Sequence, residues 1–448
     1  MPHTITIIGA GSAVFSLNMV RDLCLTPGLR GATVRFMDID PQRLAAIHAL
    51  GARYAAEVGS ELALEATTDR RAALRGADVV VNAALAAGHH RLRAGWDVAR
   101  RHGYRWGGSL HIMHDEAFWI NFFQLRLFES IIADMQELCP RAWYVQVANP
   151  VMAGITHLAR RFPQARIVGL CHGYGGVYNI ADTLGLEHAH VTFEAPGVNH
   201  FIWLTKLFYR GEDAMPLLGR WIADEGPRRW AQGDPCGELN PKKCDLYRRF
   251  GAFPIGDTAG DGGGSWGWPY HTDEATERRW LQNPAAFWQR FFSGGEQEVA
   301  EIGRIAADPA ARVTERFPPA MSGESIVPLV ESLLCDVPRT IICNIPNRGG
   351  YVSGVPTDFQ VEVPALVGRG GIQGIQTDGL PPGPLAALRR DCVAAVDLEL
   401  AAFVDGDREL LLELIVNDPW TRDADQARAL LDDILALPFN AEMRDHYG

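Results

Sequence analysis

Two short polar segments in the middle of the chain carry the residue types best suited to chemistry. Cys171, His172 and Gly173 directly follow the apolar residues 167–170, and a second segment, 197–200, ends in Asn199 and His200. A thiolate and an imidazole are suitable ligands for a divalent first-row metal ion. Two protein ligands leave positions free for substrate oxygens and water, which suits a catalytic site better than a structural one. Cys171 and His200 are therefore predicted to hold a catalytic metal ion.

The positions of these residues support the prediction, although each residue alone has an ordinary structural interpretation. A buried cysteine is usually a small hydrophobic residue, and a single histidine usually belongs to the core or the surface. However, Cys171 ends a predicted strand, Asn149 ends the preceding one, and a Pro-Gly turn allows His200 to return to the same sheet edge. Ligands collect at this edge in open α/β sheets.

A turn typical of nucleotide binding lies at the N-terminus. Gly9 permits a tight turn, and Gly11 lets backbone amides approach a pyrophosphate at the start of a helix. Val14 replaces the third glycine of the usual motif. Asp38 strengthens the signal, because a carboxylate at the end of the second strand can bind both ribose hydroxyls and would repel the 2′-phosphate of NADP. The predicted cofactor is NAD, bound by Gly9, Gly11, Ser12, Phe15, Asp38, Asn82 and Asn149. The alternative is a structural strand-turn-helix without a nucleotide.

The pattern of apolar segments predicts the frame that positions these residues. Strands are expected at 4–8, 33–37, 62–66, 78–83 and 143–148, all of them buried, with helices at 13–25 and 41–58. Alternating strands and helices of this length predict an α/β fold, with a Rossmann-like, doubly wound parallel sheet in a domain spanning residues 1–195.

The alternation of strands and helices stops after about residue 195. Residues 201–209 are expected to form a longer strand in a different sheet, and the glycine-rich residues 256–269 a mobile loop. Amphipathic helices are expected at 385–404 and 424–437. Residues 196–448 are therefore predicted to form an α+β domain for catalysis, substrate binding and oligomerisation, with its C-terminal helices packing back on the first domain.

Composition argues against several classes of protein. The chain has 448 residues, of which 47% are hydrophobic and 21% charged, and its net charge is −12. This acidic balance argues against binding to nucleic acid or an anionic membrane. No apolar run is long enough to span a bilayer, and the N-terminus enters a strand without a basic signal segment. The eight cysteines form no CxxC pair and are expected to be free thiols. A cytoplasmic protein is expected.

The combination of motifs resembles glycoside hydrolase family 4, the NAD- and metal-dependent glycosidases. The resemblance runs nearly end to end and rests on residues 7–16, 36–40, 148–150, 171–173, 197–203 and 344–347. In this family the residues after the metal-binding cysteine vary with substrate. Cys171-His172-Gly173 resembles the α-glucuronidase branch, as do residues 103–104, 254–258 and 436–438, whereas Cys-His-Ser is similar to α-galactosidases.

The resemblance implies a mechanism that differs from the usual hydrolysis by two carboxylates. NAD⁺ would take a hydride from sugar C3, and a metal ion held by Cys171 and His200, with Mn²⁺ as first candidate, would bind the C2 and C3 oxygens. A base would then remove the C2 proton, and the aglycone would leave by elimination. Water addition and return of the hydride would complete a cycle without net redox change. Asn149 and His172 would contact the sugar, and Asn199 would orient His200 or the substrate.

The same resemblance implies a base and an acid. Asp257 is the first candidate for the C2 base and Tyr270 the second; the alternative for Asp257 is a helix cap or turn residue. Asp115 is the candidate general acid, although residues 111–116 depart from the family's pattern. A uronate carboxylate would need a basic partner. The candidates for that partner are Arg91, Arg93, Arg278 and Arg279.

The predicted function is therefore an NAD- and Mn²⁺-dependent α-glycosidase that acts on a small glycoside, with an α-glucuronide as first candidate. A homodimer or homotetramer is expected. The alternatives are α-galactosidase or α-galacturonidase activity, an NAD-dependent dehydrogenase or epimerase, and a non-enzymatic NAD-binding regulator. A dehydrogenase would accumulate NADH with substrate and would not need Cys171, whereas a regulator would bind NAD without turnover.

Overall fold

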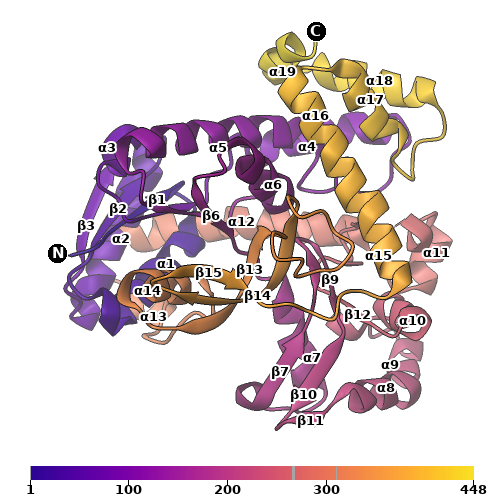
Figure 1. Cartoon of the computed structure of the whole chain (residues 1–448), viewed down its shortest axis with the longest axis horizontal. Helices are drawn as coiled ribbons and strands as arrows, with labels where there is room; N and C mark the ends of the chain where they lie inside the picture. Colours follow the sequence, from indigo (N-terminus) through magenta and orange to yellow (C-terminus); the bar gives the residue numbers. More distant parts are fainter. Residues whose placement is uncertain (1, 265–267, 309) are drawn as a thin grey trace.

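The first half of the chain folds as strands and helices that alternate around one sheet (Figure 1). The computed structural model describes residues 2–264, 268–308 and 310–448. The elements of this half are β1 (Thr4–Ile8), α1 (Ala13–Leu25), β2 (Thr33–Met37), α2 (Pro41–Val58), β3 (Ala63–Thr67), α3 (Arg70–Leu74), β4 (Val79–Asn82), α4 (Gly88–Arg101), α5 (Phe118–Leu138), β5 (Trp143–Gln146), α6 (Val151–Arg161) and β6 (Arg166–Gly169). The first four have the bounds predicted from the sequence.

Local signals in the sequence explain where these elements begin and end. Helix α2 starts with a proline after Asp40, whose carboxylate accepts hydrogen bonds from the amides of Gln42 and Arg43. It ends at Gly59, which adopts the left-handed backbone that terminates many helices. Strand β4 is buried along its whole length, as expected for a central strand of a parallel sheet that is covered on both faces.

Strands β3, β2, β1, β4, β5 and β6 pair in parallel in that order, which confirms the predicted doubly wound sheet. One prediction within it is wrong: the strand near residues 62–66 is not buried. It forms β3, which lies at the edge of the sheet and leaves Ala63, Glu65 and Ala66 exposed. The apolar pattern shows a strand but does not show whether a neighbour covers it.

The sheet continues into the second half of the chain. Beyond β6 it adds β13 (Arg339–Pro346), β14 (Gln360–Gly368), β8 (Gly197–Val198), β9 (Phe201–Leu204) and β12 (Phe253–Ile255), while β15 (Gly371–Gly374) pairs with β14. These added strands pair antiparallel. The predicted boundary at 195/196 falls just before β8.

The prediction of one long strand at 201–209 in a separate sheet is wrong. Strand β9 belongs to the main sheet, whereas β10 (Lys206–Tyr209) pairs with β7 (Val191–Glu194) and β11 (Glu212–Asp213) in a three-stranded sheet. The chain changes sheets at Thr205, whose amide and hydroxyl both donate to Glu194. The apolar pattern continues through this point, so it cannot show where the strand changes its partners.

Helices of the second half surround this extended sheet. They are α7 (Gly176–Thr183), α8 (Met215–Asp224), α9 (Gly226–Ala231), α10 (Pro241–Phe250), α11 (Glu274–Arg279), α12 (Pro284–Ala307), α13 (Val313–Arg316), α14 (Ile326–Cys335), α15 (Pro382–Leu388), α16 (Ala395–Asp405), α17 (Arg408–Val416), α18 (Ala424–Leu435) and α19 (Ala441–His446). The long helix α12 packs against α1 and α2 of the first half. The C-terminal helices α18 and α19 pack against α4 and α5, so they return to the first half as predicted (Figure 1).

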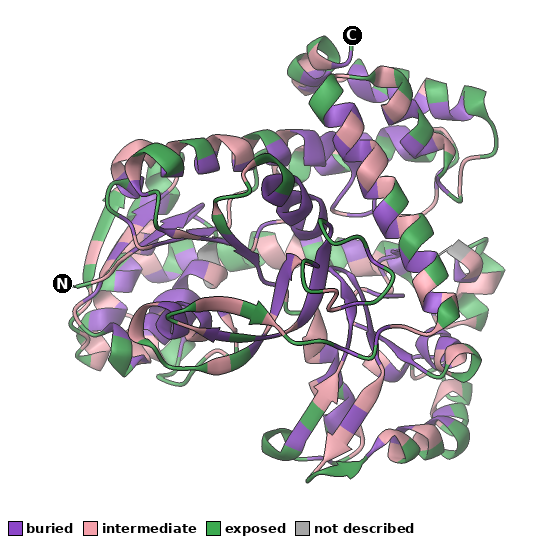
Figure 2. Cartoon of the chain, in the orientation of Figure 1, coloured by how far each residue is buried: buried purple, intermediate pink, exposed green. Residues whose placement is uncertain are grey.

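The core lies around the central strands, which are purple in Figure 2, while the outer faces of the helices are exposed. All eight cysteines are free thiols, as predicted. Among the described residues, the helices are too short or too polar to cross a membrane.

Candidate functional site

The glycine turn after β1 has the geometry of a nucleotide-binding turn. The amides of Gly9 and Ala10 donate to the carbonyl of Met37 at 2.9 and 3.0 Å. Gly9 has a φ of +80°, and a Cβ there would lie 2.5 Å from the amide nitrogen of Ala84. Glycine is therefore required at this turn.

Asp38 closes the turn from the end of β2. One carboxylate oxygen accepts from the Gly11 amide at 2.7 Å and the other from the Asp40 amide at 2.9 Å. A Cβ on Gly11 would lie 2.7 Å from the same Asp38 oxygen. Asp38 thus fixes the first residues of the turn from the end of β2, and its contact with a ribose stays a prediction.

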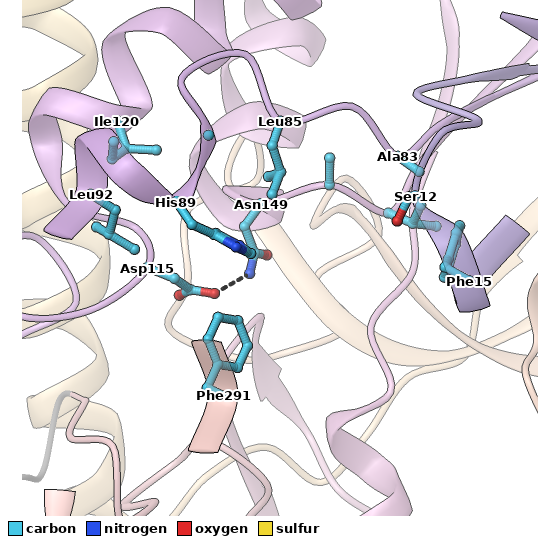
Figure 3. Close-up of a pocket in the computed structure, with 13 residues that line it drawn as sticks. Ser12, Phe15, Ala83, Leu85, His89, Leu92, Asp115, Ile120, Asn149 and Phe291 are labelled. Carbon is cyan, nitrogen blue, oxygen red and sulfur yellow. Dashed lines mark hydrogen bonds between the residues drawn. The ribbon is translucent and has the colours of Figure 1, made fainter. Parts of the chain in front are cut away.

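A cavity of about 420 Å³ opens beside this turn (Figure 3). Ser12 and Phe15 line one end, and Asp115 and Asn149 line the other, with Phe291 of α12 facing them. The remaining lining residues are largely apolar: Ala83, Leu85, Gly88, His89, Leu92, Ile120, Val147 and Ala148. Its position at the carboxyl ends of the parallel strands is where dinucleotides bind in such sheets.

Asn82, a predicted NAD contact, supports the wall of this cavity from behind. Its side chain is fully buried, donates to the Tyr144 hydroxyl at 2.9 Å and accepts from the Ala84 amide at 3.2 Å. Asn82 therefore shapes the loop against which Gly9 packs, and it does not line the cavity.

Asn149 and Asp115 form the junction with a second, smaller cavity. The Asn149 amide donates to Asp115 at 3.0 Å, as the dashed line in Figure 3 shows. The second cavity, of about 100 Å³, is lined by both of these residues and by His200, Asp257 and Phe291, among others. The two cavities therefore share Asp115, Asn149 and Phe291, so that a ligand in one would meet a ligand in the other.

The buried ring of His200 is held between groups on its two nitrogens. Nδ1 lies 2.6 Å from a carboxylate oxygen of Glu116, and Nε2 lies 3.5 Å from an oxygen of Asp257. Cys171 also shares a side-chain hydrogen bond with His200. The structure thus places the two predicted metal ligands beside each other. A carboxylate on the far nitrogen of a histidine is the arrangement that orients metal-binding imidazoles.

His114 and Asp115 extend this group of potential ligands. His114 Nδ1 lies 2.6 Å from Asp115, and ligand atoms of His114, Asp115 and His200 all lie within 4.8 Å of one another. His114 Nδ1, His200 Nδ1 and oxygens of Asp115 and Glu116 are buried without a well-aligned hydrogen bond. Three nitrogen and oxygen ligand groups this close together, those of His114, Asp115 and His200, fit a divalent cation.

Burial and charge shift the pKa values of this group strongly. Burial raises the pKa of the Cys171 thiol, and the nearby Glu362 carboxylate raises it further. Burial alone would lower the pKa of His200, but the charge of Glu116 and hydrogen bonds to Cys171 and Glu116 raise it well above its usual value. Burial would raise the pKa of Asp115, but His114, the charge of His200 and the hydrogen bond from Asn149 together outweigh this effect, and the pKa is lowered.

Asn199 lies behind the site in a buried polar network. Its side-chain amide donates to Glu362 at 3.2 Å, and its backbone amide donates to Gln360 at 3.0 Å. Gln360 in turn donates to Asn344 at 2.6 Å. Burial raises the pKa of Glu362 to about 7. Asn199 is 0% exposed, and its bonds to Gln360 and Glu362 fix the backbone just before His200. Both of its predicted roles stay predictions.

The structure separates the two candidates for the base. Asp257 lines the second cavity beside His200. Tyr270 is buried and does not line this cavity; its hydroxyl donates to Asp245 at 2.9 Å, and its ring packs edge-on against the Trp280 ring. Burial raises the pKa of Tyr270, and the Asp245 carboxylate raises it further. Asp257 thus has the geometry of a group that can take a proton from a bound ligand.

The glycine-rich loop predicted at 256–269 is packed into the site over residues 256–264. Residues 265–267 of the predicted mobile loop lie outside the described residues. Gly256 has a φ of +58°, and a Cβ there would lie 2.7 Å from the carbonyl oxygen of Gly173, next to His172. The glycine therefore allows the Asp257 loop to touch the turn that follows Cys171.

His172 is exposed at this turn, with 59% of its side chain accessible, and its Nδ1 lies 3.4 Å from Glu324.

The predicted basic partners of a uronate are not gathered around the cavities. Arg91 lies over the rings of Phe123 and Phe439 and Arg93 over Phe292. Arg278 lines a surface groove near residues 100–106 and Arg279 a separate hollow near Trp230.

Sequence reasoning missed several residues that the structure places at the site. His114 and Glu116 flank the predicted Asp115, and Glu362 and Trp288 come from the second half of the chain. The sequence does contain a signal for Glu362, because this charged residue stands between Val361 and Val363 in a largely apolar strand. The sequence contains no such signal for Trp288, since this residue belongs to the ordinary apolar pattern of α12.

Two family models match most of the chain. Residues 4–186 match the model described as family 4 glycosyl hydrolase, and residues 195–421 match its C-terminal domain. An α-glucosidase of Erwinia rhapontici is 27% identical and covers 93% of this chain and 94% of its own length. An α-galacturonidase of Bacillus subtilis is 24% identical, covering 96% of each chain. A 6-phospho-α-glucosidase from gut microorganisms, solved in complex with NAD and Mn²⁺, has the same fold, with a TM-score of 0.80, 19% identity and 99% coverage of both chains.

Proposed function

The chain belongs to the family 4 glycosyl hydrolases, and we propose that it cleaves a small α-glycoside with the help of NAD and a divalent metal ion. The observation that carries the proposal is the shared wall of the two cavities. A nicotinamide in the larger cavity and a metal-bound sugar in the smaller one would meet at Asn149 and Asp115.

The cofactors would be held by groups whose chemistry suits them. Asp38, Gly9 and Gly11 are the contacts proposed for NAD, and Cys171 and His200 those proposed for the metal ion, with Mn²⁺ as first candidate. NAD supplies a hydride acceptor, and a divalent ion supplies a Lewis acid that polarises a sugar oxygen. Glu116 fixes the His200 ring, so that its Nε2 faces the smaller cavity beside Asp257.

Three polar side chains would act on the substrate. Asn149 is placed to orient a sugar hydroxyl, because it lines both cavities. Asp257 is the proposed base that removes the proton from C2. Asp115 is the proposed general acid, held in place by His114 and Asn149. Because its lowered pKa keeps it ionised without substrate, it would have to take up a proton before it can protonate the leaving oxygen.

The first candidate substrate is an α-glucuronide, in keeping with the Cys171-His172-Gly173 segment. The similarity to an α-galacturonidase supports a uronide. Exposed His172, next to Cys171, is the group proposed to meet the sugar beyond the metal ion.

A neutral α-hexoside is the second candidate, because the charge around the cavities favours it. The described residues that line the two cavities include Asp115 and Asp257 but no lysine or arginine. Phe287, Trp288 and Phe291 add aromatic surface that suits an uncharged sugar ring. The similarity to an α-glucosidase agrees with this alternative.

The function can be tested with 4-nitrophenyl α-glucuronide, α-galacturonide, α-galactoside and α-glucoside, each with and without NAD⁺ and Mn²⁺ under reducing conditions. We expect turnover only when both cofactors are present, and preference for one sugar identifies the substrate. Cys171→Ser and His200→Ala should abolish turnover and leave NAD binding intact, while Cys139→Ser, at a buried thiol remote from the site, should stay active.

The same assay separates glycosidase from dehydrogenase activity. A glycosidase of this kind returns its hydride, so NADH does not accumulate in proportion to product. Stoichiometric NADH formation, or full activity of Cys171→Ser, would favour a dehydrogenase or epimerase. NAD binding without turnover of any glycoside would favour a regulator.

A further inference from the structure

Two buried lysines lie side by side next to the site. The chain has only three lysines among its 42 lysine and arginine residues: Lys206, Lys242 and Lys243. Lys242 is 0% exposed and Lys243 2%, whereas Lys206 is partly exposed and forms ion pairs with Glu194 and Asp378. Burying an ammonium group costs free energy unless it is well hydrogen-bonded. A pair of buried lysines in a chain that otherwise uses arginine therefore needs a physical explanation.

Lys243 hydrogen-bonds to the first residue of the glycine-rich loop. From α10 its Nζ donates to the carbonyl of Gly256 at 2.6 Å and to the carboxylate of Glu238 at 2.8 Å. The same Glu238 oxygen accepts from the Gly256 amide at 2.8 Å. Both backbone groups of Gly256 are thus bound to the lysine–glutamate pair.

Lys242 hydrogen-bonds to the same loop four residues further along the chain, at Gly260. Its Nζ donates to the carbonyl of Gly260 at 2.8 Å and lies 3.1 Å from His271 Nε2. The carbonyl of His271 accepts from Arg105. The loop is also tied to the segment before the site residues, because the Gly264 amide donates to the Gly108 carbonyl at 3.0 Å.

The proposed base is the first of the three residues between the two carbonyls that the lysines bind. Asp257 directly follows Gly256, and the amide of Gly260 donates back to the Asp257 carbonyl at 3.1 Å. Thr258 accepts from the Ile202 amide at 2.7 Å. This short turn therefore has little freedom to move while both lysines hold it, although its glycines would otherwise leave it flexible.

We propose that Lys242 and Lys243 are positioning residues that hold the Asp257 turn against His200 and the smaller cavity. The catalytic consequence rests on the proposed role of Asp257. Lysine suits this task better than arginine, since a compact amino group on a flexible stem can reach one carbonyl and one side chain in a fully buried space.

Hydrogen exchange of the turn tests the proposal without any activity assay. Lys242→Met and Lys243→Met remove the donors and keep an unbranched apolar side chain, and Lys206→Met is the matched control on the surface. In the protein without ligands, amides of residues 256–264 should exchange about tenfold faster or more in the first two variants. The control should exchange like the wild type. Unchanged exchange in both buried variants would overturn the proposal, whatever their activity.

Kinetics test the link to Asp257. With a glycoside that the wild type turns over, Lys242→Met should lower kcat about tenfold or more, while KM and the NAD dissociation constant change less than about twofold. Deuterium at sugar C2 should slow the variant more than the wild type, because proton removal becomes more limiting. A faster-exchanging turn with wild-type kcat would overturn the positioning role.

Two further outcomes remain decisive. If no glycoside is turned over by the wild type, the proposed function fails, and the exchange data alone decide whether the lysines hold the turn. If the buried variants do not fold, the wild type is measured instead. Amides of Gly260 and Gly264 that exchange as fast as an unstructured chain would then overturn the proposal.

Discussion

At the scale of single residues, the ring of His200 is the most constrained group of the site. Glu116 contacts one ring nitrogen, and Asp257 lies near the other. Neither carboxylate is near His200 in sequence, so the ring is contacted by two segments that are distant from its own. Such control of a histidine sets both its tautomer and its direction.

Glu116→Gln should therefore weaken metal binding without removing a ligand. We expect a loss of about 10–100-fold in Mn²⁺ affinity or activity, because the ring of His200 loses the charge that orients it. Titration with Mn²⁺ in the presence of NAD measures the effect. Glu129→Gln is a matched control, since Glu129 lies 2.8 Å from Nε2 of His157 on another face. Wild-type Mn²⁺ affinity in Glu116→Gln would contradict this role.

Lys242 should make stability depend on pH above neutrality. Burial lowers its pKa from 10.5 to about 7. Between these values the unfolded chain holds a proton at this position that the folded protein lacks, so the free energy of unfolding rises with pH. Below pH 7 both states are protonated, and the cost of the buried charge is then fully present.

Thermal melts of the wild type and Lys242→Met across pH 6 to 10.5 test this sign. The wild type should gain stability relative to the variant as pH rises from about 7, by at least about 1.4 kcal/mol, which corresponds to one pKa unit. Lys206→Met should give no such trend. A wild type that loses stability relative to Lys242→Met over this range would show that Lys242 is charged and stabilised in the folded protein.

At the scale of elements, the site depends on loops that follow strands and touch one another. The turn after β6 carries Cys171, and the turn after β12 carries Asp257. These turns meet where Gly256 packs on Gly173. Each strand fixes the start of its loop, and the close contact of two glycines fixes the distance between them.

Gly256→Ala should separate these two turns. The left-handed backbone at Gly256 costs an alanine about 1–2 kcal/mol, and its Cβ would lie 2.7 Å from the Gly173 carbonyl oxygen. We expect a lower melting temperature and a reduced kcat with NAD affinity unchanged. Gly233→Ala is a suitable control, because Gly233 has a similar backbone, with φ +82°, but open space around its Cα. Equal kcat in both variants would show that the contact has no catalytic importance.

At the scale of the whole molecule, the two halves of the chain share one sheet and one site. Helix α12 supplies Phe287, Trp288 and Phe291 to the cavities and packs against α1 and α2. Strands of the second half extend the sheet beyond β6. The nucleotide cavity and the metal-binding group therefore depend on the packing of the same elements.

The two halves should consequently unfold together and respond together to ligands. A ligand at about 100 times its dissociation constant stabilises a protein by about 2.7 kcal/mol, which for a chain of this size raises Tm by roughly 2–4 °C. NAD and Mn²⁺ should each shift a single calorimetric transition. Cys171→Ser should abolish the Mn²⁺ shift and keep the NAD shift. Two transitions, of which NAD shifts only one, would show that the halves unfold independently.

Much of the first half was open to prediction from the sequence. Residues 4–8, 13–25, 33–37 and 41–58 form the predicted elements, because local apolar periodicity, Gly9, Pro41 and Gly59 act within a few residues. The glycine turn with Asp38 and the position of Cys171 after a strand were predicted for the same reason. These residues follow β1, β2 and β6, and parallel strands bring their carboxyl ends to one edge.

Contacts between distant segments were beyond the reach of these local patterns. Three features join parts of the chain that share no periodicity. Residues 201–209 divide between two sheets, Glu116 contacts the His200 ring, and Lys242 hydrogen-bonds to the Gly260 carbonyl. Side-chain type and spacing are local properties and determine which groups are available for chemistry. Which of those groups meet, and which nitrogen or oxygen faces the cavity, is decided by packing, because burial and hydrogen bonding depend on neighbours supplied by the whole fold.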